Sequence, residues 1–333
     1  MNVRENIESI EEKILSPFAS LAKNSKGRKN EDEVCNLRTV YQVDRGRIIH
    51  CESFRRLKHK TQMFFSPEKE HYRTRLTHTL EVSQIARNIS RALLLNEDLT
   101  EAIALGHDLG HTPFGHAGES ALNEIMPEGF SHFEQSVRIV ERLEKNGKGL
   151  NLTYEVLDGI LNHTKGTWPQ TLEGKVVRFA DRIAYINHDI DDAIRGQILT
   201  LSQLPQDALK ILGIEGKFRI DAMMYSIIEN STNGEIKMSE DVSYAFNKLH
   251  EFMYANVYCD RSKAKVETVK VPDFIKLLYD YLIKHPDKWP NEIKEIAEKE
   301  SKERAVCDYI SSMTDKFAVD LFKDIFIPHS WTL

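Results

Sequence analysis

The sequence of 333 residues predicts an all-α protein. Apolar residues recur at intervals of three and four along almost the whole chain, as they do on the buried faces of amphipathic helices. Alternating runs of Val, Ile and Thr, which are typical of strands, are scarce, and no internal repeat or low-complexity tract is present. We therefore expect a single, mainly helical domain.

The composition excludes several classes of protein. With 41% hydrophobic and 29% charged residues, a chain of this length can bury a sizeable core. A net charge of −6 argues against a globally basic nucleic-acid-binding protein. The four cysteines lack any CxxC pair, which disfavours a zinc ribbon or a disulfide framework; they are Cys35, Cys51, Cys259 and Cys307.

No signal peptide or membrane span is expected. The first 30 residues lack an uninterrupted apolar core, and no stretch elsewhere approaches the length that crosses a bilayer. Together with the cysteine usage, this pattern predicts a soluble protein in the reducing cytoplasm, with no membrane partner.

The chain is expected to contain three regions. Residues 1–34 are predicted to form an N-terminal helix and a mobile link, because the segment from Asn24 to Glu33 is polar. Residues 35–200 are predicted to form the helical core, with a loop at 144–151. Residues 201–333 are predicted to form a C-terminal helical region whose segment 304–318 packs back on the core. An amphipathic stretch at 274–282 suits packing within one chain or between subunits.

The first helix of interest is predicted over 74–95. Val82, Ile85, Ile89 and Leu93 form its apolar stripe, and His78 continues that stripe toward the N-terminal end. His78 therefore points inward. By itself, an inward histidine is more often a hydrogen-bonded core residue than a metal ligand.

The next helix is predicted to begin with Asn96 or Thr100 as N-cap and to end at Gly110. His107 and Asp108 then lie in its last turn, where one divalent metal could be reached by both side chains. The alternative is that His107 stabilises the helix C-terminus while Asp108 is solvated.

A third helix is predicted over 174–196. Its apolar stripe contains Phe179, Ile183, Ile186, Ile190 and Ile194, and Asp181, Tyr185, His188 and Asp192 fall on the opposite face. That face suits either solvent or a functional cleft. Asp181 adds a second carboxylate to the candidate ligands, and imidazole with carboxylate suits Mn²⁺, Fe²⁺ or Co²⁺, as well as Mg²⁺, better than structural zinc.

The H…HD…D order of these candidates resembles that of HD-domain phosphohydrolases. Further segments resemble the bacterial deoxyguanosine triphosphate triphosphohydrolases; they are Asp44–Ile49, Phe54–Leu57, Lys60–Gln62, Arg73–His78 and Arg304–Ile310. The resemblance is dense over 35–200 and returns at 304–318, and the chain is similar to a compact member of the family. It implies an HD-domain helical core with a C-terminal helical extension.

This resemblance implies a reaction and a metal site. His78, His107, Asp108 and Asp181 would bind the metal, which can activate water and polarise a phosphoryl oxygen. The family hydrolyses a deoxynucleoside triphosphate to deoxynucleoside and inorganic triphosphate, and dGTP is the substrate that the family name favours.

The leaving 5′-oxygen of that reaction needs a proton donor. His116 with Glu119 is similar to the family's catalytic pair, and His111 and His132 resemble further histidines that face the phosphates. The alternative for His111 and His116 is a loop held by side-chain hydrogen bonds. His132 is assigned a supporting role, because Ser131 before it could cap a helix.

Substrate-binding residues are also implied. Residues 45–60 contain six basic residues against one acidic residue, a net charge of +5, which suits a triphosphate or a solvated surface. Arg182 would contact phosphates, while Tyr185 and Asp189 would contact the deoxyribose. The remaining candidates are Arg55 and Arg75 for the phosphates and Lys60 and Gln62, with His59, for the base.

Two other classes of function stay open at this point. The four metal ligands would also serve an HD phosphohydrolase that acts on a nucleoside monophosphate, a cyclic nucleotide or an alarmone. A nucleotide sensor or a single-stranded DNA-binding module is the other class, although no row of interleaved aromatic residues marks a stacking platform. The family resemblance further implies self-association, and the sequence leaves base preference, native metal and activation by a second nucleotide open.

Overall fold

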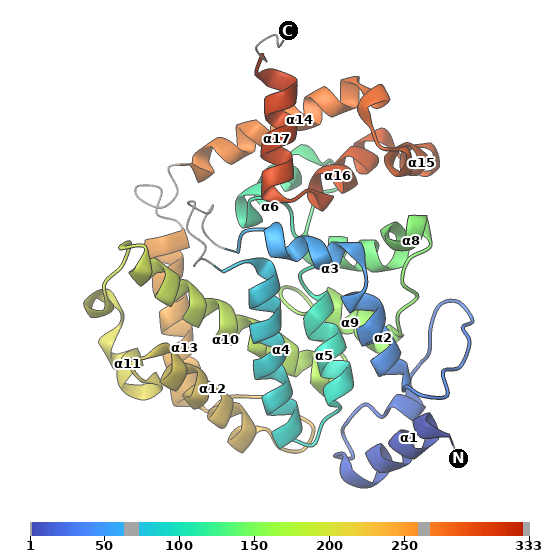
Figure 1. The fold of residues 1–333 in the computed structure, drawn as a ribbon. Coiled ribbons are helices and arrows are strands. Elements are labelled where there is room, and N and C mark those ends of the chain that lie inside the picture. The colour runs from blue at the N-terminus through green and yellow to red at the C-terminus, as the bar shows by residue number, and fades with distance from the viewer. Residues whose placement is uncertain (1, 63–72, 259–266, 329–333) are drawn as a thin grey trace. The chain divides into compact units, whose positions relative to one another are not determined.

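The computed structural model describes residues 2–62, 73–258 and 267–328, and over these ranges the chain is helical (Figure 1). No strand is present in the described ranges; extended pairing is limited to isolated bridges between Arg28 and Thr153 and between Thr61 and Thr74. The predicted all-α class is therefore confirmed.

The chain divides into two compact units, each built from three separate segments. The first unit comprises Met1–His50, His78–His107 and Leu150–Ala264. Its elements are α1 (Val3–Ile14), η1 (Ala22–Asn24), α2 (Val40–Ile49), most of α4 (Arg75–Ala92), α5 (Glu97–Gly106), α9 (Tyr154–Leu161), α10 (Leu172–Arg195), η4 (Leu201–Gln203), α11 (Gln206–Leu212), α12 (Gly216–Asn230), α13 (Glu240–Met253) and η5 (Tyr254–Tyr258).

The second unit comprises Cys51–Thr77, Asp108–Gly149 and Lys265–Leu333. Its elements are α3 (Glu52–Arg56), η2 (Leu57–His59), the start of α4, α6 (Gly115–Ile125), α7 (His132–Arg138), η3 (Ile139–Leu143), α8 (Glu144–Gly147), η6 (Thr268–Lys270), α14 (Val271–Lys284), η7 (Pro286–Lys288), α15 (Asn291–Lys299), α16 (Lys302–Ser312) and α17 (Asp315–Phe326). The three regions expected from the sequence are contiguous stretches of chain, whereas each unit combines separate segments. The three regions therefore stay predictions.

The first unit is organised around α5. Helices α2, α9 and α10 all pack against it. Gly159 of α9 makes the close approach to α5 feasible, because a β-carbon at that position would lie 2.4 Å from Ile103. The apolar stripes predicted for α4 and α10 are buried at Val82, Ile85, Ile89, Ile183, Ile186 and Ile190.

The predicted start of α5 is confirmed, and its predicted end is wrong. Asn96 is the N-cap, and its side chain accepts hydrogen bonds from the amides of Asp98 and Leu99. The helix ends at Gly106 rather than at Gly110, with His107 as C-cap. The amide of Gly110 donates instead to the Ser136 hydroxyl at 2.8 Å, so the chain leaves the helix before that residue.

The segment expected to be a mobile link makes specific contacts within the first unit. It has no helix between Ser25 and Glu33. The Lys26 amide donates to Glu155 at 2.7 Å, and Arg28 forms an ion pair with the buried Asp44.

The core of the second unit lies between α6, α14, α16 and α17. Leu122, Ile275, Leu278, Val306 and Ile310 are fully buried there. The amphipathic stretch at 274–282 therefore buries its apolar face within this unit, against α6 and α16. The segment 304–318 is divided between α16 and α17, because Thr314 caps a new helix by accepting from the amide of Phe317.

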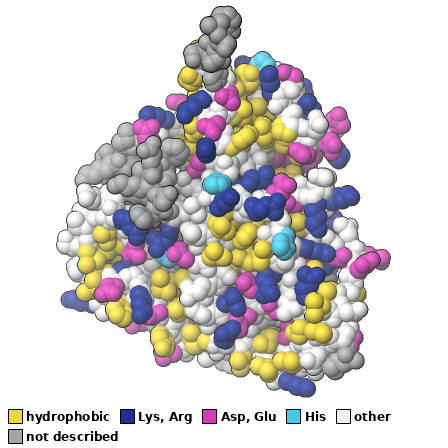
Figure 2. Space-filling model, in the orientation of Figure 1, with side chains coloured by type: hydrophobic (Ala, Val, Ile, Leu, Met, Phe, Trp, Pro, Cys, Tyr) yellow, Lys and Arg dark blue, Asp and Glu magenta, His cyan; other side chains and the backbone are white. Residues whose placement is uncertain are grey.

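The face drawn in Figure 2 carries hydrophobic as well as charged side chains. Figure 2 shows basic and acidic side chains interspersed over the visible face, with basic side chains gathered where α3 lies in Figure 1. Over the described residues, no helix has both the length and the apolar character that a bilayer-spanning segment requires.

Candidate functional site

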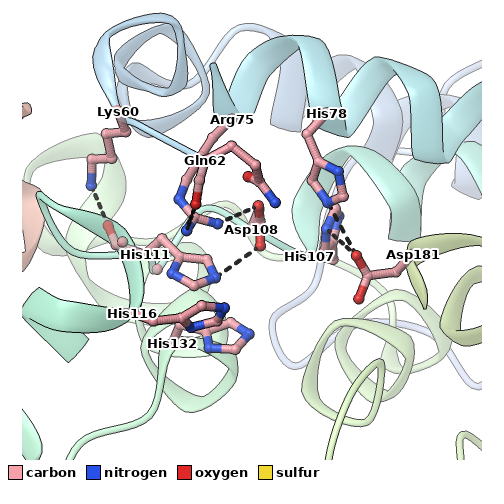
Figure 3. Close-up of polar contacts among 12 residues, drawn as sticks. Lys60, Gln62, Arg75, His78, His107, Asp108, His111, His116, His132 and Asp181 are labelled. Atoms are coloured by element: carbon pink, nitrogen blue, oxygen red, sulfur yellow. Dashed lines mark hydrogen bonds and ion pairs between the residues drawn. The ribbon is translucent and has the colours of Figure 1, made fainter. Parts of the chain in front are cut away.

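Three helices of the first unit bring His78, His107 and Asp181 together (Figure 3). His78 lies in the first turn of α4, His107 caps the C-terminus of α5, and Asp181 lies on α10. Nε2 of His78 is 3.1 Å from Oδ1 of Asp181, and Nε2 of His107 is 3.7 Å from the same oxygen. Both imidazoles are buried.

The orientation of His107 is fixed by the main chain. Its Nδ1 lies 2.6 Å from the carbonyl oxygen of Ala104, which can only accept, so Nδ1 carries the proton. Nε2 is then the nitrogen that faces Asp181 and that would bind a metal. Metal-binding histidines are commonly held in this way by a hydrogen bond from the other ring nitrogen.

Asp181 is ionised in this environment. Burial by itself would raise the pKa of its carboxyl, but the hydrogen bond with His78 and the nearby imidazoles of His107 and His163 hold that pKa below its usual range. The first unit thus presents imidazole nitrogens and a carboxylate in a buried setting without thiolates, a donor set that fits a divalent ion of borderline hardness.

His163 was missed by the sequence analysis. It follows the end of α9 and is buried, and its ring lies 5.0 Å from that of His107. One ligand atom from each of His107, His163 and Asp181 lies within 4.8 Å of the others. The only available signal was a histidine placed directly after an apolar helix, as His107 is.

In the second unit, Asp108 is held on both carboxylate oxygens (Figure 3). The Arg75 guanidinium donates to Oδ2 at 2.9 Å, and Nε2 of His111 lies 3.2 Å from Oδ1. The Arg75 and Asp108 side chains are only 2% and 4% exposed. Because a buried ionised carboxylate fixes the proton on the nitrogen beside it, His111 donates to Asp108 through Nε2.

His111 and His132 are stacked. Their ring centroids are 3.9 Å apart with an angle of 13° between the planes. Burial, followed by the nearby Arg75 and His132, lowers the pKa of the His111 imidazole well below its ordinary value. His111 is therefore neutral at pH 7, and in this structure its Nε2 contacts the Asp108 carboxylate.

Glu119 links two histidines. Its Oε1 accepts from the His132 amide at 2.9 Å and lies 2.8 Å from His132 Nδ1, while Oε2 lies 3.4 Å from His116 Nδ1. Burial would raise the pKa of the Glu119 carboxyl, but these contacts with His116 and His132 keep it far below its ordinary value. Glu119 is ionised, whereas the His116 side chain is 79% exposed.

Glycines set the backbone of this histidine-rich segment. Helix α6 starts at Gly115 with φ of +58°, directly after Phe114 with φ of +63°. A β-carbon at Gly118 would lie 2.1 Å from the carbonyl oxygen of Pro113, and one at Gly110 would lie 2.3 Å from the carbonyl oxygen of His132. Close main-chain contact therefore positions α6 and α7 relative to the turn after Asp108.

The residues predicted for the base and phosphates occupy different environments in the second unit. Lys60 is buried, and its ammonium donates to the carbonyl oxygens of His111 and Ser311. The main-chain oxygen of Gln62 accepts from Arg75 at 3.4 Å. Arg55 is exposed and 4.0 Å from Glu52. Lys60 and Arg75 are both buried and bound to internal partners through their functional groups.

Arg182, predicted for the phosphates, lies on α10 in the first unit with Tyr185 and Asp189, predicted for the sugar. Arg182 lies over the Phe246 ring at 4.7 Å, and the Tyr185 ring lies 6.1 Å from that of His250. Asp189 accepts a hydrogen bond of 2.5 Å from the Tyr258 hydroxyl. The sequence analysis missed these three partners because α13 and η5 lie more than fifty residues away in the chain.

The predicted site residues thus fall into two groups. Asp181, His78 and His107, with Arg182, Tyr185 and Asp189, belong to the first unit; Asp108, His111, His116, Glu119 and His132, with Arg55, Lys60, Gln62 and Arg75, belong to the second. The chain passes from one unit to the other at the peptide bond between His107 and Asp108.

Comparison with known proteins identifies the family. Residues 75–186 match the HD domain, and residues 236–324 match the phosphohydrolase-associated domain. A deoxyguanosinetriphosphate triphosphohydrolase-like protein of Caldanaerobacter subterraneus is 56% identical, covering 99% of this chain and 98% of its own length. Proteins of the same name from Desulfatibacillum aliphaticivorans and Clostridium perfringens are 46% and 47% identical, each covering 98% of this chain and 99% and 98% of their own lengths.

Similarity to a solved structure is weaker. A hypothetical protein from Aquifex aeolicus has 19% identity and a TM-score of 0.47, over 85% of this chain and 71% of its own. The extent and identity of the sequence matches are decisive, and the chain belongs to the family of deoxyguanosinetriphosphate triphosphohydrolase-like proteins, HD-domain hydrolases.

Proposed function

We propose that this protein hydrolyses deoxynucleoside triphosphates, with dGTP as the favoured substrate, to deoxynucleoside and inorganic triphosphate. The observation that carries the proposal is the meeting of His78, His107 and Asp181 from three helices, in a chain 56% identical to a relative named for this reaction. A buried set of imidazole and carboxylate donors is typical of hydrolytic metal centres.

The proposed ligands of the divalent ion are His78, His107, Asp108 and Asp181. Asp108 directly follows His107, so their Cα atoms are about 3.8 Å apart. Arg75 and His111 orient the Asp108 carboxylate from both sides. A bound Mn²⁺, Fe²⁺, Co²⁺ or Mg²⁺ would lower the pKa of water and polarise the α-phosphoryl oxygen.

His116 is the proposed proton donor. When water attacks the α-phosphorus, the bond between phosphorus and the sugar 5′-oxygen breaks, and that oxygen takes the proton from the His116 imidazolium. The ionised Glu119 lies 3.4 Å from Nδ1 of His116 and would orient the ring. The exposure of His116 leaves it accessible to a substrate, while His132 steadies Glu119 from the other side.

The sugar is the proposed source of discrimination against ribonucleotides. Tyr185 is backed by His250, and Asp189 is held by Tyr258. A tyrosine ring against C2′ leaves no room for a hydroxyl, and a carboxylate accepts from the 3′-hydroxyl. Arg182, Arg75 and Arg55 are proposed for the phosphates and Gln62 for the base; Lys60 would support the base contact from its buried position.

Product analysis tests the reaction. Purified protein is incubated with each deoxynucleoside triphosphate and Mn²⁺ or Mg²⁺, and phosphorus NMR identifies the phosphate product. Inorganic triphosphate supports the proposal. Orthophosphate or pyrophosphate, or turnover only of monophosphates, cyclic nucleotides or alarmones, would assign a different HD phosphohydrolase. Salt-dependent binding of single-stranded DNA without turnover would favour the binding module.

Self-association is proposed from the family resemblance, and a cytoplasmic location is proposed from the cysteine usage and the absence of a signal-peptide pattern. Size-exclusion chromatography with light scattering measures the first, and fractionation of the source cells measures the second. A monomer at all accessible concentrations would remove the homo-oligomer from the proposal.

A further inference from the structure

We propose that His163 is a further ligand of the divalent ion held by His107 and Asp181. The first unit would then supply an additional imidazole beyond the four ligands proposed above. The inference rests on the proposed metal site, and it is independent of which nucleotide is hydrolysed.

The placement of His163 is the first argument. It is 1% exposed, and its ligand atom lies within 4.8 Å of those of both His107 and Asp181. Around one ion with bonds near 2.1 Å, neighbouring ligand atoms are roughly 3 Å apart and opposite ones roughly 4.2 Å apart. Small side-chain adjustments therefore suffice to place all three atoms on one ion.

The second argument is the tautomer. Nδ1 of His163 lies 2.7 Å from the carbonyl oxygen of Ile160, just as Nδ1 of His107 lies 2.6 Å from that of Ala104. In both cases the acceptor is the residue three positions earlier. A carbonyl oxygen only accepts, so Nδ1 carries a proton in each ring, and Nε2 is the nitrogen through which each ring would bind a metal.

The third argument is the donor set. His163 adds an imidazole to the imidazole of His107 and the carboxylate of Asp181, and one ligand atom from each lies inside the same 4.8 Å. Imidazole and carboxylate together suit a divalent ion of borderline hardness.

The ligand chemistry has a consequence for the choice of metal. Imidazole suits Fe²⁺, Co²⁺ and Ni²⁺ better than Mg²⁺, which prefers oxygen ligands. An additional imidazole therefore biases the site toward a transition ion. The contribution of His163 to this preference is measured by replacing it and comparing the loss of Co²⁺ affinity with the loss of Mg²⁺ affinity.

The test uses the full chain, freed of metal by chelation. His163→Asn keeps a donor near the position of Nδ1 and removes Nε2, while His163→Ala removes both. His188→Asn is the matched control, because His188 is also buried and lies 2.9 Å from Glu81 rather than beside Asp181. Circular dichroism checks folding, calorimetry measures Co²⁺ and Mg²⁺ affinity, and pulsed EPR of bound Mn²⁺ counts coordinated nitrogens.

We expect His163→Asn to weaken Co²⁺ binding at least ~10-fold, a loss of the size seen when metal-site residues are removed. Mg²⁺ affinity should fall less, one nitrogen coupling should disappear, and the control should match the wild type. Unchanged nitrogen coupling in a folded His163 variant would overturn the inference, even with weaker binding, because His163 would then only position Asp181. A wild type that binds no ion would refute the proposed metal site as well.

Discussion

The Arg75 guanidinium and the Asp108 carboxylate form a 2.9 Å ion pair from which water is almost excluded. Removing one partner of such a pair leaves a buried charge without compensation. Because Asp108 is a proposed metal ligand, this pair connects the stability of the second unit to the chemistry of the site.

Replacement of Arg75 should therefore destabilise the metal-free protein. We expect Arg75→Met to lower the free energy of unfolding by about 3–5 kcal/mol. Urea unfolding followed by circular dichroism measures the change. Arg91→Met is the control, since Arg91 pairs with Glu97 on the surface and should have little effect. Equal stability of the two variants would contradict a stabilising role for the buried pair.

Asp181→Asn should abolish metal binding while preserving the fold. The amide has nearly the shape of the carboxylate but lacks its charge. Wild-type protein should gain about 2.7 kcal/mol of stability at a metal concentration of 100 times Kd. The variant should gain nothing, as measured by thermal unfolding with and without Mn²⁺. Asp221 lies on α12 and is not one of the proposed ligands, so Asp221→Asn is the control. A metal-dependent stabilisation retained in Asp181→Asn would remove Asp181 from the ligand set.

His116→Ala should affect turnover rather than metal binding. Loss of a general acid typically reduces kcat by about 10²–10⁴-fold. The His116 side chain is exposed and is not one of the proposed ligands, so calorimetric Mn²⁺ affinity should stay at the wild-type value. His50→Ala, also on the surface, should leave both quantities unchanged. Weakened metal binding with normal kcat at saturating metal would reassign His116.

Lys60 should give the stability a dependence on pH. Burial, together with Arg56, lowers its pKa to about 7. Between this value and the unfolded pKa of about 10.4, the unfolded chain holds a proton that the folded chain has released, so stability rises with pH by up to ~1.4 kcal/mol per unit. The contribution is complete above the unfolded pKa and is lost as the pH falls to about 7.

Lys60→Met should remove that rise. Because other groups titrate over the same range, the informative quantity is the difference in unfolding free energy between wild type and variant at each pH from about 7 to 10. The exposed neighbour Lys58 provides the control variant Lys58→Met. Parallel curves for wild type and Lys60→Met would show that Lys60 stays charged throughout.

Tyr185→Ala should relax selection of the sugar. Opening the space beside C2′ is expected to raise hydrolysis of GTP relative to dGTP by about 10–100-fold, measured as the ratio of kcat/KM values. Tyr225→Ala, which removes an exposed ring from α12, should leave the ratio unchanged. If both variants retain the wild-type ratio, discrimination lies elsewhere.

Local signals in the sequence were sufficient for the helical class and for several boundaries. Most positions of the apolar stripes predicted for α4 and α10 are buried, while Leu93, Phe179 and Ile194 are only partly buried, and Asn96 caps α5. Helix α5 was predicted to continue to Gly110, four residues too far; the amide of Gly110 instead donates to the Ser136 hydroxyl, 26 residues further along the chain. No periodic pattern contains that information.

The candidate site shows the same division. The order of histidines and aspartates identified the family, which the comparisons confirmed, but it could not show what each side chain contacts. His111 was expected to face the phosphates, and it lies against Asp108. His163 was missed because the sequence near it does not show that it lies close to His107 at the end of α5 and to Asp181 on α10. Lys60 was expected at the base, and its burial arises from α16, some 250 residues away in the sequence.

The crowded glycines of the turn and of α6 bear on how this protein would behave under random mutation. Neither Gly110 nor Gly118 has a functional group, yet a methyl group at either would collide with a peptide carbonyl. A saturation library selected for activity should thus find both positions as intolerant as the histidines between them. Mutational tolerance alone would therefore wrongly classify Gly110 and Gly118 as catalytic residues, although their role is to permit close packing of the main chain.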